Sequence, residues 1–319
     1  MDRLAAMRVF TAVVDAQGFS AASRVLRMPL STVSRKIADL ESHVGAQLLT
    51  RSTRKVIVTD SGWRYYQDAR RILDAVEDAE RQVSGEYRQP MGHLTITAPT
   101  LFGRRILLPI ATSFMRIHRD ITIRFHLTNA VVDLLAEHIN LGIRIGPLAD
   151  SSMIATQAGT IREIVCASPD YIARHGRPLS PRDLAGHQCI TYAWSDAPKE
   201  WAFKSATGQL QRVPVQARLA LNSIEGIVLA AVQDAGVAMV YAYQAAHHIA
   251  DGRLEIVLSD YEIDPRPVSF IYPQDRLVPQ KVRAFIDFAM PRLRERLAIV
   301  AAQCAADRGP AARKRVSAR

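Results

Sequence analysis

The sequence predicts an α/β protein with an N-terminal winged helix-turn-helix, a long linker helix and a two-lobed α/β domain. Three observations lead to this fold class. Residues 19–45 contain two short helical patterns around a proline, and residues 60–88 form a long helical pattern rich in charge. After Gly92 the pattern changes to strands that alternate with helices, which is typical of an α/β domain.

The length of 319 residues is large for one hydrophobic core, so two or three compact units are expected. The predicted division is a winged helix-turn-helix at 1–60, a linker helix at 61–90, a ligand-binding domain at 91–300 and a disordered basic tail at 301–319.

The composition is that of a globular protein, with 48% hydrophobic and 23% charged residues. No apolar run approaches the ~20 residues of a membrane span, and no signal-peptide pattern is visible, so we expect a cytoplasmic protein without a membrane partner. The net charge of +10 favours an anionic polymer as partner, although the tail supplies part of it. Cys166, Cys189 and Cys304 form no metal or disulfide pattern. They are interpreted as reduced packing residues, with a redox-sensing pair as the alternative.

The second helix of the helix-turn-helix is predicted to begin after Ser31 and to include the residues up to Val44. Pro29 cannot continue the preceding helix, and Ser31 stands where an N-cap would begin the next one. The apolar residues of this helix recur at spacings of four, three and four, which makes one buried stripe. They are Val33, Ile37, Leu40 and Val44.

The opposite side of this helix carries Ser31 and Arg35, with Thr32 and Ser34 on its flanks. Hydroxyls and helix N-termini bind phosphates, and arginine reaches guanine edges in the major groove, so these four residues are candidates for DNA contacts. The alternative is an ordinary amphipathic helix with a solvated face.

Residues 48–59 read as two short strands around a basic turn, which together would form a wing. Cationic side chains there would reach the DNA backbone or minor groove. The predicted contacts are Arg51, Thr53, Arg54 and Lys55.

Many positions in this region resemble the N-terminal winged helix-turn-helix of LysR-type transcriptional regulators. The matching positions are Phe10, Phe19 to Ala22, Leu26, Val33 to Ile37, Leu40, Glu41, Gly45, Leu48, Leu49, Arg51, Thr53, Arg54, Thr59 and Gly62. The resemblance implies a transcription regulator whose partner is double-stranded DNA.

The linker pattern has a narrow seam at alternating spacings of three and four, flanked by charged residues. Its predicted members are Tyr66, Ala69, Leu73, Val76 and Val83. Such a seam pairs with a partner copy or packs on its own domain. The resemblance implies a homodimer, and tetramers are typical of the family.

The domain from residue 91 is predicted to contain a mainly parallel sheet, with helices at 102–118 and 130–138. Two crossings of the chain suggest two lobes with a hinged cleft of the periplasmic-binding-protein kind. Lobe I would comprise 91–161 and 268–300, and lobe II would comprise 162–267. The resemblance extends here with weaker motifs, such as Ala98-Pro99-Thr100 and Gly142-Ile143-Arg144.

Ligands of such domains bind beyond the carboxyl ends of strands, near helix starts. The residues predicted at these places are Thr100, Leu101, Phe102, Thr128 and Asn129 in lobe I, and Asn222 and Ser223 in lobe II. Hydroxyls and free N–H groups suit a carboxylate, although simple N-capping explains any one of them. Arg144 would bind an effector anion or form a structural salt bridge.

No nucleophile, zinc or P-loop motif is present, and His247-His248 has no third ligand at metal spacing, so neither an enzyme nor a metal site is predicted. No cofactor is expected beyond a small-molecule effector, expected to be an organic anion. The alternatives are a solute-binding protein or an enzyme with an appended DNA-binding module. Aromatic residues of lobe II would wall the cleft or simply pack; they are Tyr192, Trp194, Trp201 and Phe203.

Overall fold

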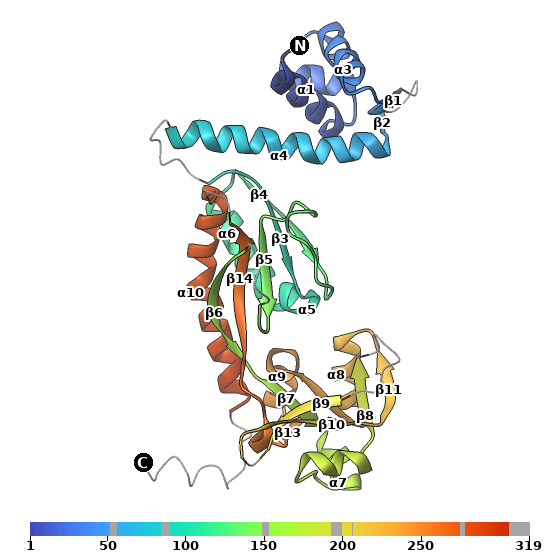
Figure 1. The fold of residues 1–319 in the computed structure, drawn as a ribbon, viewed down its shortest axis with the longest axis vertical. Coiled ribbons are helices and arrows are strands. Elements are labelled where there is room, and N and C mark those ends of the chain that lie inside the picture. The colour runs from blue at the N-terminus through green and yellow to red at the C-terminus, as the bar shows by residue number, and fades with distance from the viewer. Residues whose placement is uncertain are drawn as a thin grey trace. The chain divides into compact units, whose positions relative to one another are not determined.

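The computed structural model describes residues 1–51, 56–83, 90–148, 153–192, 200–205, 207–274 and 278–305. The chain divides into two units, Met1–His93 and Leu94–Arg319 (Figure 1). None of the described helices combines the length and the apolar character that a membrane span requires.

The first unit is a three-helix core followed by a two-stranded hairpin and a long helix. Its elements are α1 (Arg3–Asp15), α2 (Phe19–Leu26), α3 (Leu30–Val44), β1 (Leu49–Arg51), β2 (Val56–Val58) and α4 (Asp60–Val83). Phe10 of α1 and Ile37 of α3 are fully buried in one cluster with Leu48 and Leu49 at the start of the hairpin. The hairpin is antiparallel, with Leu49 opposite Val58.

Helix α3 begins two residues earlier than predicted, at Leu30. Pro29 is the N-cap, with φ −57° and ψ 140°, and Ser31 lies inside the first turn without acting as a cap. The predicted Ser31 cap is therefore wrong. The proline ring already holds the extended conformation that an N-cap needs, so no side-chain cap is required. Arg27 closes α2 in the left-handed region at φ 51°.

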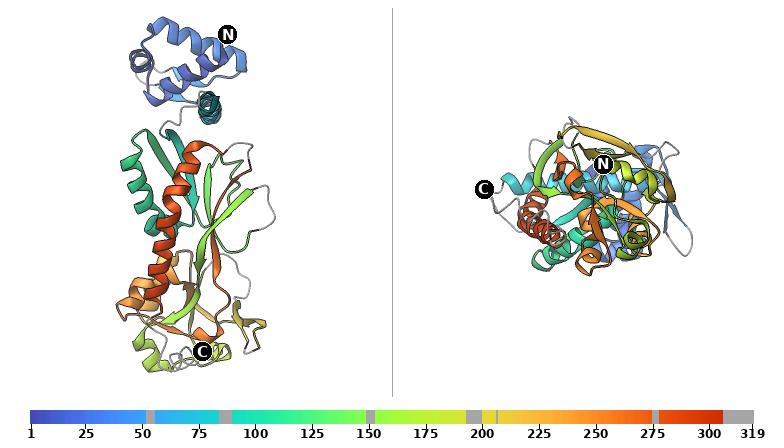
Figure 2. Two further views of the ribbon diagram at one scale, coloured as in Figure 1. Left: turned by 90° about the vertical axis from the view of Figure 1, so that its left-hand side faces the viewer. Right: turned by 90° about the horizontal axis from the view of Figure 1, so that it is seen from below.

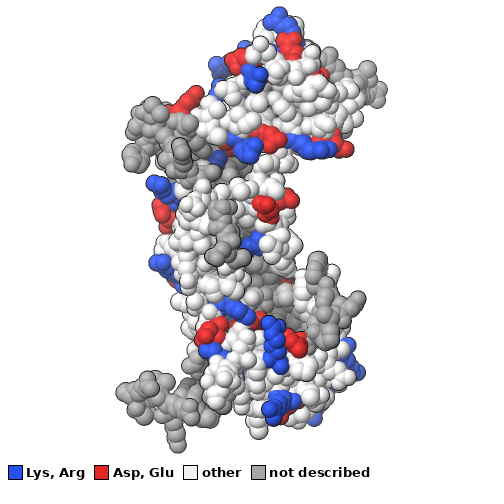
Figure 3. Space-filling model, viewed as in Figure 1, with Lys and Arg blue, Asp and Glu red and all other residues white. Residues whose placement is uncertain are grey.

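Helix α4 buries part of its predicted seam within its own chain. Tyr66 belongs to the core of the first unit, and its hydroxyl donates a hydrogen bond to Asp15 of α1. Tyr66 therefore packs on its own domain. Ala69 and Leu73 are also buried in the single chain, whereas Val76 is half-buried. The side chain of Val83 lies outside the described residues. Basic and acidic side chains alternate along the face of α4 seen in Figure 3.

The second unit contains two five-stranded sheets, which define its two lobes. The sheet of lobe I has the order β4-β3-β5-β14-β6. Its strands are β3 (Gly92–Ala98), β4 (Ile121–Leu127), β5 (Leu141–Ile145), β6 (Met153–Ile161) and β14 (Arg266–Pro273). Strands β3 and β5 are parallel, but β14 is antiparallel to both β5 and β6. The sheet is thus mixed instead of mainly parallel, because β14 enters it as a return from lobe II.

The sheet of lobe II has the order β11-β8-β12-β7-β13. Its strands are β7 (Glu163–Ala167), β8 (Cys189–Tyr192), β11 (Ala217–Leu221), β12 (Val237–Tyr241) and β13 (Glu255–Val257). Strands β11, β8 and β12 are parallel, whereas β7 is antiparallel to both β12 and β13. A separate hairpin of β9 (Glu200–Lys204) and β10 (Leu210–Pro214) belongs to the same lobe.

Helices cover the two sheets. Those of lobe I are α5 (Thr100–Phe102), the π-helix η1 (Gly103–Leu107), α6 (Leu108–Ile117) and α10 (Gln280–Gln303). Those of lobe II are α7 (Pro169–His175), α8 (Ile224–Val232) and α9 (Ala242–Ala250), with the short 3-10 helices η2 (Pro181–Gly186) and η3 (Ser259–Tyr261).

The helix predicted at 130–138 is absent, and turns take its place. The carboxylate of Asp133 accepts hydrogen bonds from the backbone N–H groups of Leu135 (2.8 Å) and Ala136 (3.2 Å). Such local side-chain bonds offer the backbone an alternative to helix, which explains the failure of this prediction.

Helix α10 continues through Gln303, and Cys304 is fully buried, so the prediction of a disordered tail from Ala301 is wrong for residues 301–305. The carbonyl of Cys304 accepts a hydrogen bond from Arg162 (3.3 Å), which holds this end against the protein. Residues 306–319 lie outside the described residues. Figure 2 shows α10 running along lobe I towards the lobe II helices, where it contacts α9.

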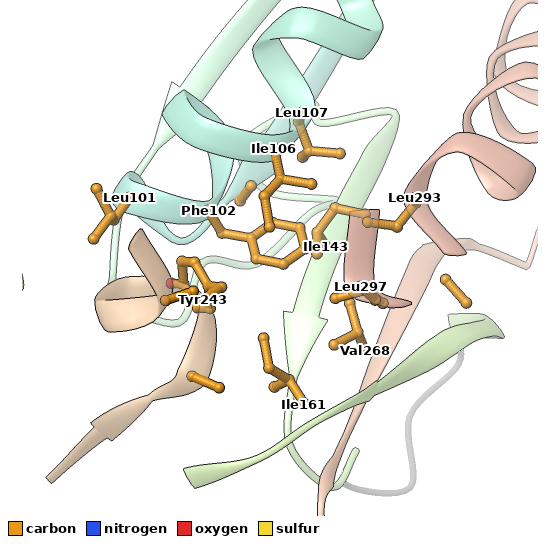
Figure 4. Packing of buried hydrophobic residues seen from close by; sticks show 14 of the residues in the cluster. Leu101, Phe102, Ile106, Leu107, Ile143, Ile161, Tyr243, Val268, Leu293 and Leu297 are labelled. Atoms are coloured by element: carbon orange, nitrogen blue, oxygen red, sulfur yellow. The ribbon is translucent and has the colours of Figure 1, made fainter. Parts of the chain in front are cut away.

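One hydrophobic cluster joins the two lobes (Figure 4). Phe102 of α5 meets Tyr243 of α9 edge to face, with ring centroids 5.2 Å apart. Leu293 and Leu297 of α10 belong to the same cluster. The two lobes therefore share part of one hydrophobic core.

Gly62, in the first turn of α4, lies against the hairpin. A Cβ at this position would lie 2.0 Å from the carbonyl oxygen of Leu48. We predict that Gly62→Ala lowers the free energy of unfolding by ~1–3 kcal/mol, although alanine favours helix by up to about 1 kcal/mol. Urea denaturation of the first unit measures this change. Gly18→Ala is the control, because a Cβ at Gly18 meets no atom within 4 Å. Equal stability of the two variants would contradict the prediction.

Candidate functional site

The outer face of α3 is the candidate DNA interface. Val33, Ile37 and Leu40 are buried, and they turn the opposite face of the helix to solvent. Ser31 and Arg35 are exposed on that face, while Thr32 and Ser34 are half-buried at its margins. The four residues therefore lie together as the sequence predicts.

The wing residues are only partly described. Arg51 ends strand β1, but its side chain lies outside the described residues, as do Thr53, Arg54 and Lys55. Arg24 and Arg27, at the end of α2, are exposed next to the start of α3. Sequence reasoning missed this pair. Two arginines just before the proline turn were the available signal.

The predicted effector residues of lobe I meet beyond the ends of β3 and β4. The backbone N–H of Thr100 donates to Oδ1 of Asn129 (3.1 Å), and that of Thr128 donates to the carbonyl of Ala98 (3.1 Å). The hydroxyl of Thr128 accepts from the N–H of Ala130 (3.1 Å). Thr128 thus caps a turn, because no helix follows it.

Leu101 and Phe102 do not belong to the polar part of this site. Both are buried, and Phe102 lies in the cluster between the lobes. Their side chains pack in the hydrophobic cluster that joins the two lobes and offer no polar contacts.

In lobe II, Ser223 is the N-cap of α8 and accepts a hydrogen bond from the N–H of Gly226 (3.2 Å). Asn222 and Ser223 are both exposed. Two residues further on, Glu225 forms an ion pair with Arg104 of η1 (2.8 Å). Since Arg104 lies one turn after Thr100, this ion pair connects the predicted site elements of the two lobes.

A second arginine of η1 also reaches lobe II. Arg105 donates to the carbonyl of Gln244 (3.3 Å) and to Nδ1 of His247 (3.1 Å), both on α9. Burial, together with the charge of Arg105, lowers the pKa of His247, which suits a neutral acceptor. A π-helix turns less per residue than an α-helix, so successive side chains diverge less. This geometry lets Arg104 and Arg105 both span the junction.

Arg144 is a half-buried cation on β5. Its guanidinium donates to the carbonyl of Val132 (3.0 Å), in the segment that follows Thr128 and Asn129. Burial lowers its pKa. Within the described part of the chain no carboxylate pairs with Arg144, so the structural salt bridge considered from the sequence is not found there.

The chain passes between the lobes at Arg162, which lies between β6 and β7. Its guanidinium makes two hydrogen bonds to the carboxylate of Glu262 (2.7 and 2.6 Å), and both side chains are largely buried. Its carbonyl accepts from the N–H of Ala242 (2.9 Å), the first residue of α9. The hydrogen bonds to Glu262 raise the pKa of Arg162, so this cation stays charged.

All three cysteines are buried. Burial raises the pKa of Cys166 and of Cys189 to about 12 in each case, which suppresses the reactive thiolate and fits packing roles. Among the described residues, no group of three or more His, Cys, Asp or Glu side chains could hold a metal ion. Trp201 and Phe203 pack in the core of lobe II, Tyr192 packs against the shared cluster, and Trp194 lies outside the described residues.

Comparison with protein families identifies two matches that together account for most of the chain. The model described as bacterial regulatory helix-turn-helix protein, lysR family, matches residues 4–63. The model described as LysR substrate binding domain matches residues 87–294.

Relatives match over nearly their whole length. The chain is 31% identical over 287 residues to the HTH-type transcriptional activator AaeR of Escherichia coli K12, covering 90% of this chain and 93% of that protein. It is 30% identical over 288 residues to the HTH-type transcriptional regulator CrgA of Neisseria meningitidis serogroup C, covering 90% and 96%.

Two solved structures share the fold. CrgA, a LysR-type transcriptional regulator from Neisseria meningitidis, has a TM-score of 0.59 at 29% identity and covers 90% of this chain and 98% of its own. The virulence activator AphB of Vibrio cholerae has a TM-score of 0.58 at 28% identity, with the same coverage. They confirm the predicted fold class of a helix-turn-helix joined to a two-lobed α/β domain.

The Arg162–Glu262 pair provides a stability test. We predict that Arg162→Met lowers the free energy of unfolding of the second unit by ~3–5 kcal/mol, because it leaves a buried carboxylate without its partner. Lys204→Ala is the control. It removes the pair with Asp264 (2.5 Å), which is more exposed, and should cost less than about 1 kcal/mol. Urea denaturation compares the two, and similar losses would refute the special role of Arg162.

Proposed function

Since the chain belongs to the LysR-type transcriptional regulators, we propose that it controls transcription by reading an operator with α3 and by responding to a small organic anion. It is a regulator and not an enzyme, as its relatives are named. Regulators of this family bind DNA and form oligomers, and their regulatory domain takes the effector. Because it acts on the chromosome, we infer a cytoplasmic location.

The observation that carries the DNA-reading proposal is the exposed Arg35 above the buried stripe of α3. In this proposal Arg35 reads a base edge in the major groove, and Ser31, Thr32 and Ser34 bind phosphate or base. The wing residues Arg51, Thr53, Arg54 and Lys55 add contacts to the DNA backbone or minor groove.

The proposed working form is a homodimer or a pair of dimers. Two recognition helices must lie about one DNA turn apart, which requires two copies of the chain. Helix α4 is the proposed pairing element through Val76 and Val83, because Ala69 and Leu73 are already buried within the single chain. Tyr66 is left out because it packs against α1 of its own chain.

Arg144 is the observation that supports an anionic effector. Among the described residues this half-buried guanidinium donates to a neutral carbonyl, and a bound carboxylate would give it a charged partner. Thr100 and Asn129 are joined by a hydrogen bond in lobe I, and Ser223 lies two residues before Glu225, which pairs with Arg104 from lobe II.

The Arg104–Glu225 pair suggests how binding would act on the lobes. A bound carboxylate near Thr100 and Ser223 would compete with Glu225 for Arg104 and so change a contact between the lobes. The effector can shift the assembly only by the difference between its affinities for the two arrangements. By the same linkage, operator DNA must change effector affinity by an equal factor.

We predict that Arg35→Ala reduces the preference for operator over random DNA by ~1–3 kcal/mol without unfolding the protein, because Arg35 is exposed. Competition binding with fragments that the protein selects from genomic DNA measures this preference. As the control, Arg54→Ala/Lys55→Ala should weaken binding to both DNAs and flatten the salt dependence by about 0.9 per lost phosphate contact. An undiminished preference in Arg35→Ala would remove this residue from the base contacts.

For the effector site we predict that Thr100→Val and Thr128→Val each weaken carboxylate binding by ~1 kcal/mol, and Arg144→Met by ~1.5–3 kcal/mol. Carboxylates that raise the melting temperature of the full chain are chosen from a panel, and calorimetry measures their affinity beside the matching amides. Thr112→Val, whose hydroxyl bonds within α6, is the control. Wild-type affinity in all three site variants would show that the effector binds elsewhere.

A further inference from the structure

The side chain of Glu41 on α3, the proposed recognition helix, is bound to the start of the β1–β2 hairpin, which is the wing. Glu41 lies on α3 one turn after Ile37 and is half-buried. Its Oε1 accepts hydrogen bonds from the backbone N–H groups of Leu48 (2.8 Å) and Leu49 (2.9 Å), where the chain enters β1. Both leucines are buried in the core of the first unit. Bonds from N–H groups to an ionised carboxylate are about twice as strong as neutral ones.

The other strand of the wing is tied to the same place. The N–H of Thr59 donates to the carbonyl of Leu48 (3.0 Å), and its hydroxyl donates to the carbonyl of Gln47 (2.8 Å). The same hydroxyl accepts from the N–H of Gly62 (2.9 Å) at the start of α4. Leu48 is thus held from α3 through its N–H and from the end of β2 through its carbonyl.

We propose that Glu41 is a positioning residue for DNA binding, which fixes the wing relative to the recognition helix without touching DNA. The proposal rests on the wing contacts put forward above. Arg35 and Glu41 lie on the same helix, so a wing fastened to Glu41 keeps a set distance from the base-reading face. If those two N–H groups lost their acceptor, the wing base would move independently of α3 and its cations would meet the phosphates less often.

The reading that Glu41 only stabilises the fold makes a different prediction. A purely structural residue changes the melting temperature but leaves the number of phosphate contacts in the folded protein unchanged. The salt dependence of DNA binding counts these contacts, so it separates the two roles.

The experiment uses the full chain and a random-sequence DNA duplex. Glu41→Ala should lower affinity about fivefold to tenfold at moderate salt and reduce the salt slope by about 0.9 for each lost contact. In the Arg54→Ala/Lys55→Ala background, adding Glu41→Ala should change affinity less than twofold, because the contacts that Glu41 supports are already gone. Amide hydrogen exchange of Leu48 and Leu49 should speed up in Glu41→Ala and stay at the wild-type rate in the wing variant.

Two conservative variants sharpen the result. Glu41→Gln keeps an oxygen that can accept both N–H groups and should retain most of the wild-type slope. Glu41→Asp keeps the charge but is one methylene too short to reach both N–H groups, so it should behave like Glu41→Ala. If Glu41→Ala fails to fold, Glu41→Asp takes its place in the experiment.

The outcomes are distinguishable. A normal slope in Glu41→Ala beside a reduced slope in the wing variant would overturn the role of Glu41 alone. The role of Glu41 would also be overturned if Glu41→Ala lowered DNA affinity by the same factor in the wild-type chain and in the Arg54→Ala/Lys55→Ala background. A normal slope in the wing variant would instead refute the wing contacts of the proposed function, and the role of Glu41 with them.

Discussion

The ion pair between Arg162 and Glu262 is the interaction on which the arrangement of the two lobes depends. Four segments meet at Arg162: the passage from β6 to β7, the approach to β14 through Glu262, the start of α9 at Ala242, and the end of α10 at Cys304. Two of these segments carry the chain between the lobes. A planar guanidinium with donors in several directions can satisfy such a junction, whereas lysine offers only a point charge. The junction therefore ties both passages of the chain between the lobes to the start of α9 and the end of α10.

The contacts further from this junction are of another kind. Phe102 and Tyr243 pack as apolar surfaces without fixed direction, while Arg104–Glu225 and Arg105–His247 are exposed polar contacts. Exposed ion pairs contribute roughly 0–1 kcal/mol each, so a ligand can replace them at small cost. The junction thus has a largely buried ion pair where the chain crosses between the lobes, and exposed pairs further out that are weaker.

Local patterns were enough to predict much of the fold. The stripe of Val33, Ile37 and Leu40 repeats with the helix period, and Ser223 caps α8 as its position suggests, because both depend on neighbours within a few residues. Polar residues of the candidate effector site, Thr100, Thr128 and Asn129, were also found together, since parallel strands end at one edge of a sheet.

The failures have long-range or competing causes. The local spacing of α4 places Tyr66 in the seam, but its hydroxyl bonds to Asp15, which lies far away in the sequence and does not enter a local pattern. Cys304 reads as part of a polar tail, and only the bond from Arg162 reveals why α10 continues to it. Residues 130–138 have a helical pattern, but the Asp133 carboxylate accepts hydrogen bonds from the N–H groups of Leu135 and Ala136, and the segment forms turns instead. None of these three outcomes can be predicted from the spacing of hydrophobic residues along the sequence.

The charges at the lobe junction also bear on which ligands it would favour. Arg104 and Glu225 neutralise each other, so this pair alone gives no preference for either sign of ligand. Arg144 breaks the balance, because burial has lowered its pKa and its described partner is a neutral carbonyl. A cation that displaced Arg104 from Glu225 would add positive charge to a lobe whose Arg144 has no carboxylate partner among the described residues. An anion that displaced Glu225 would instead give Arg104 a new negatively charged partner. In the proposed function, the half-buried Arg144 is therefore the residue that would select an anion, and the exposed Arg104–Glu225 pair would determine how easily the lobes respond.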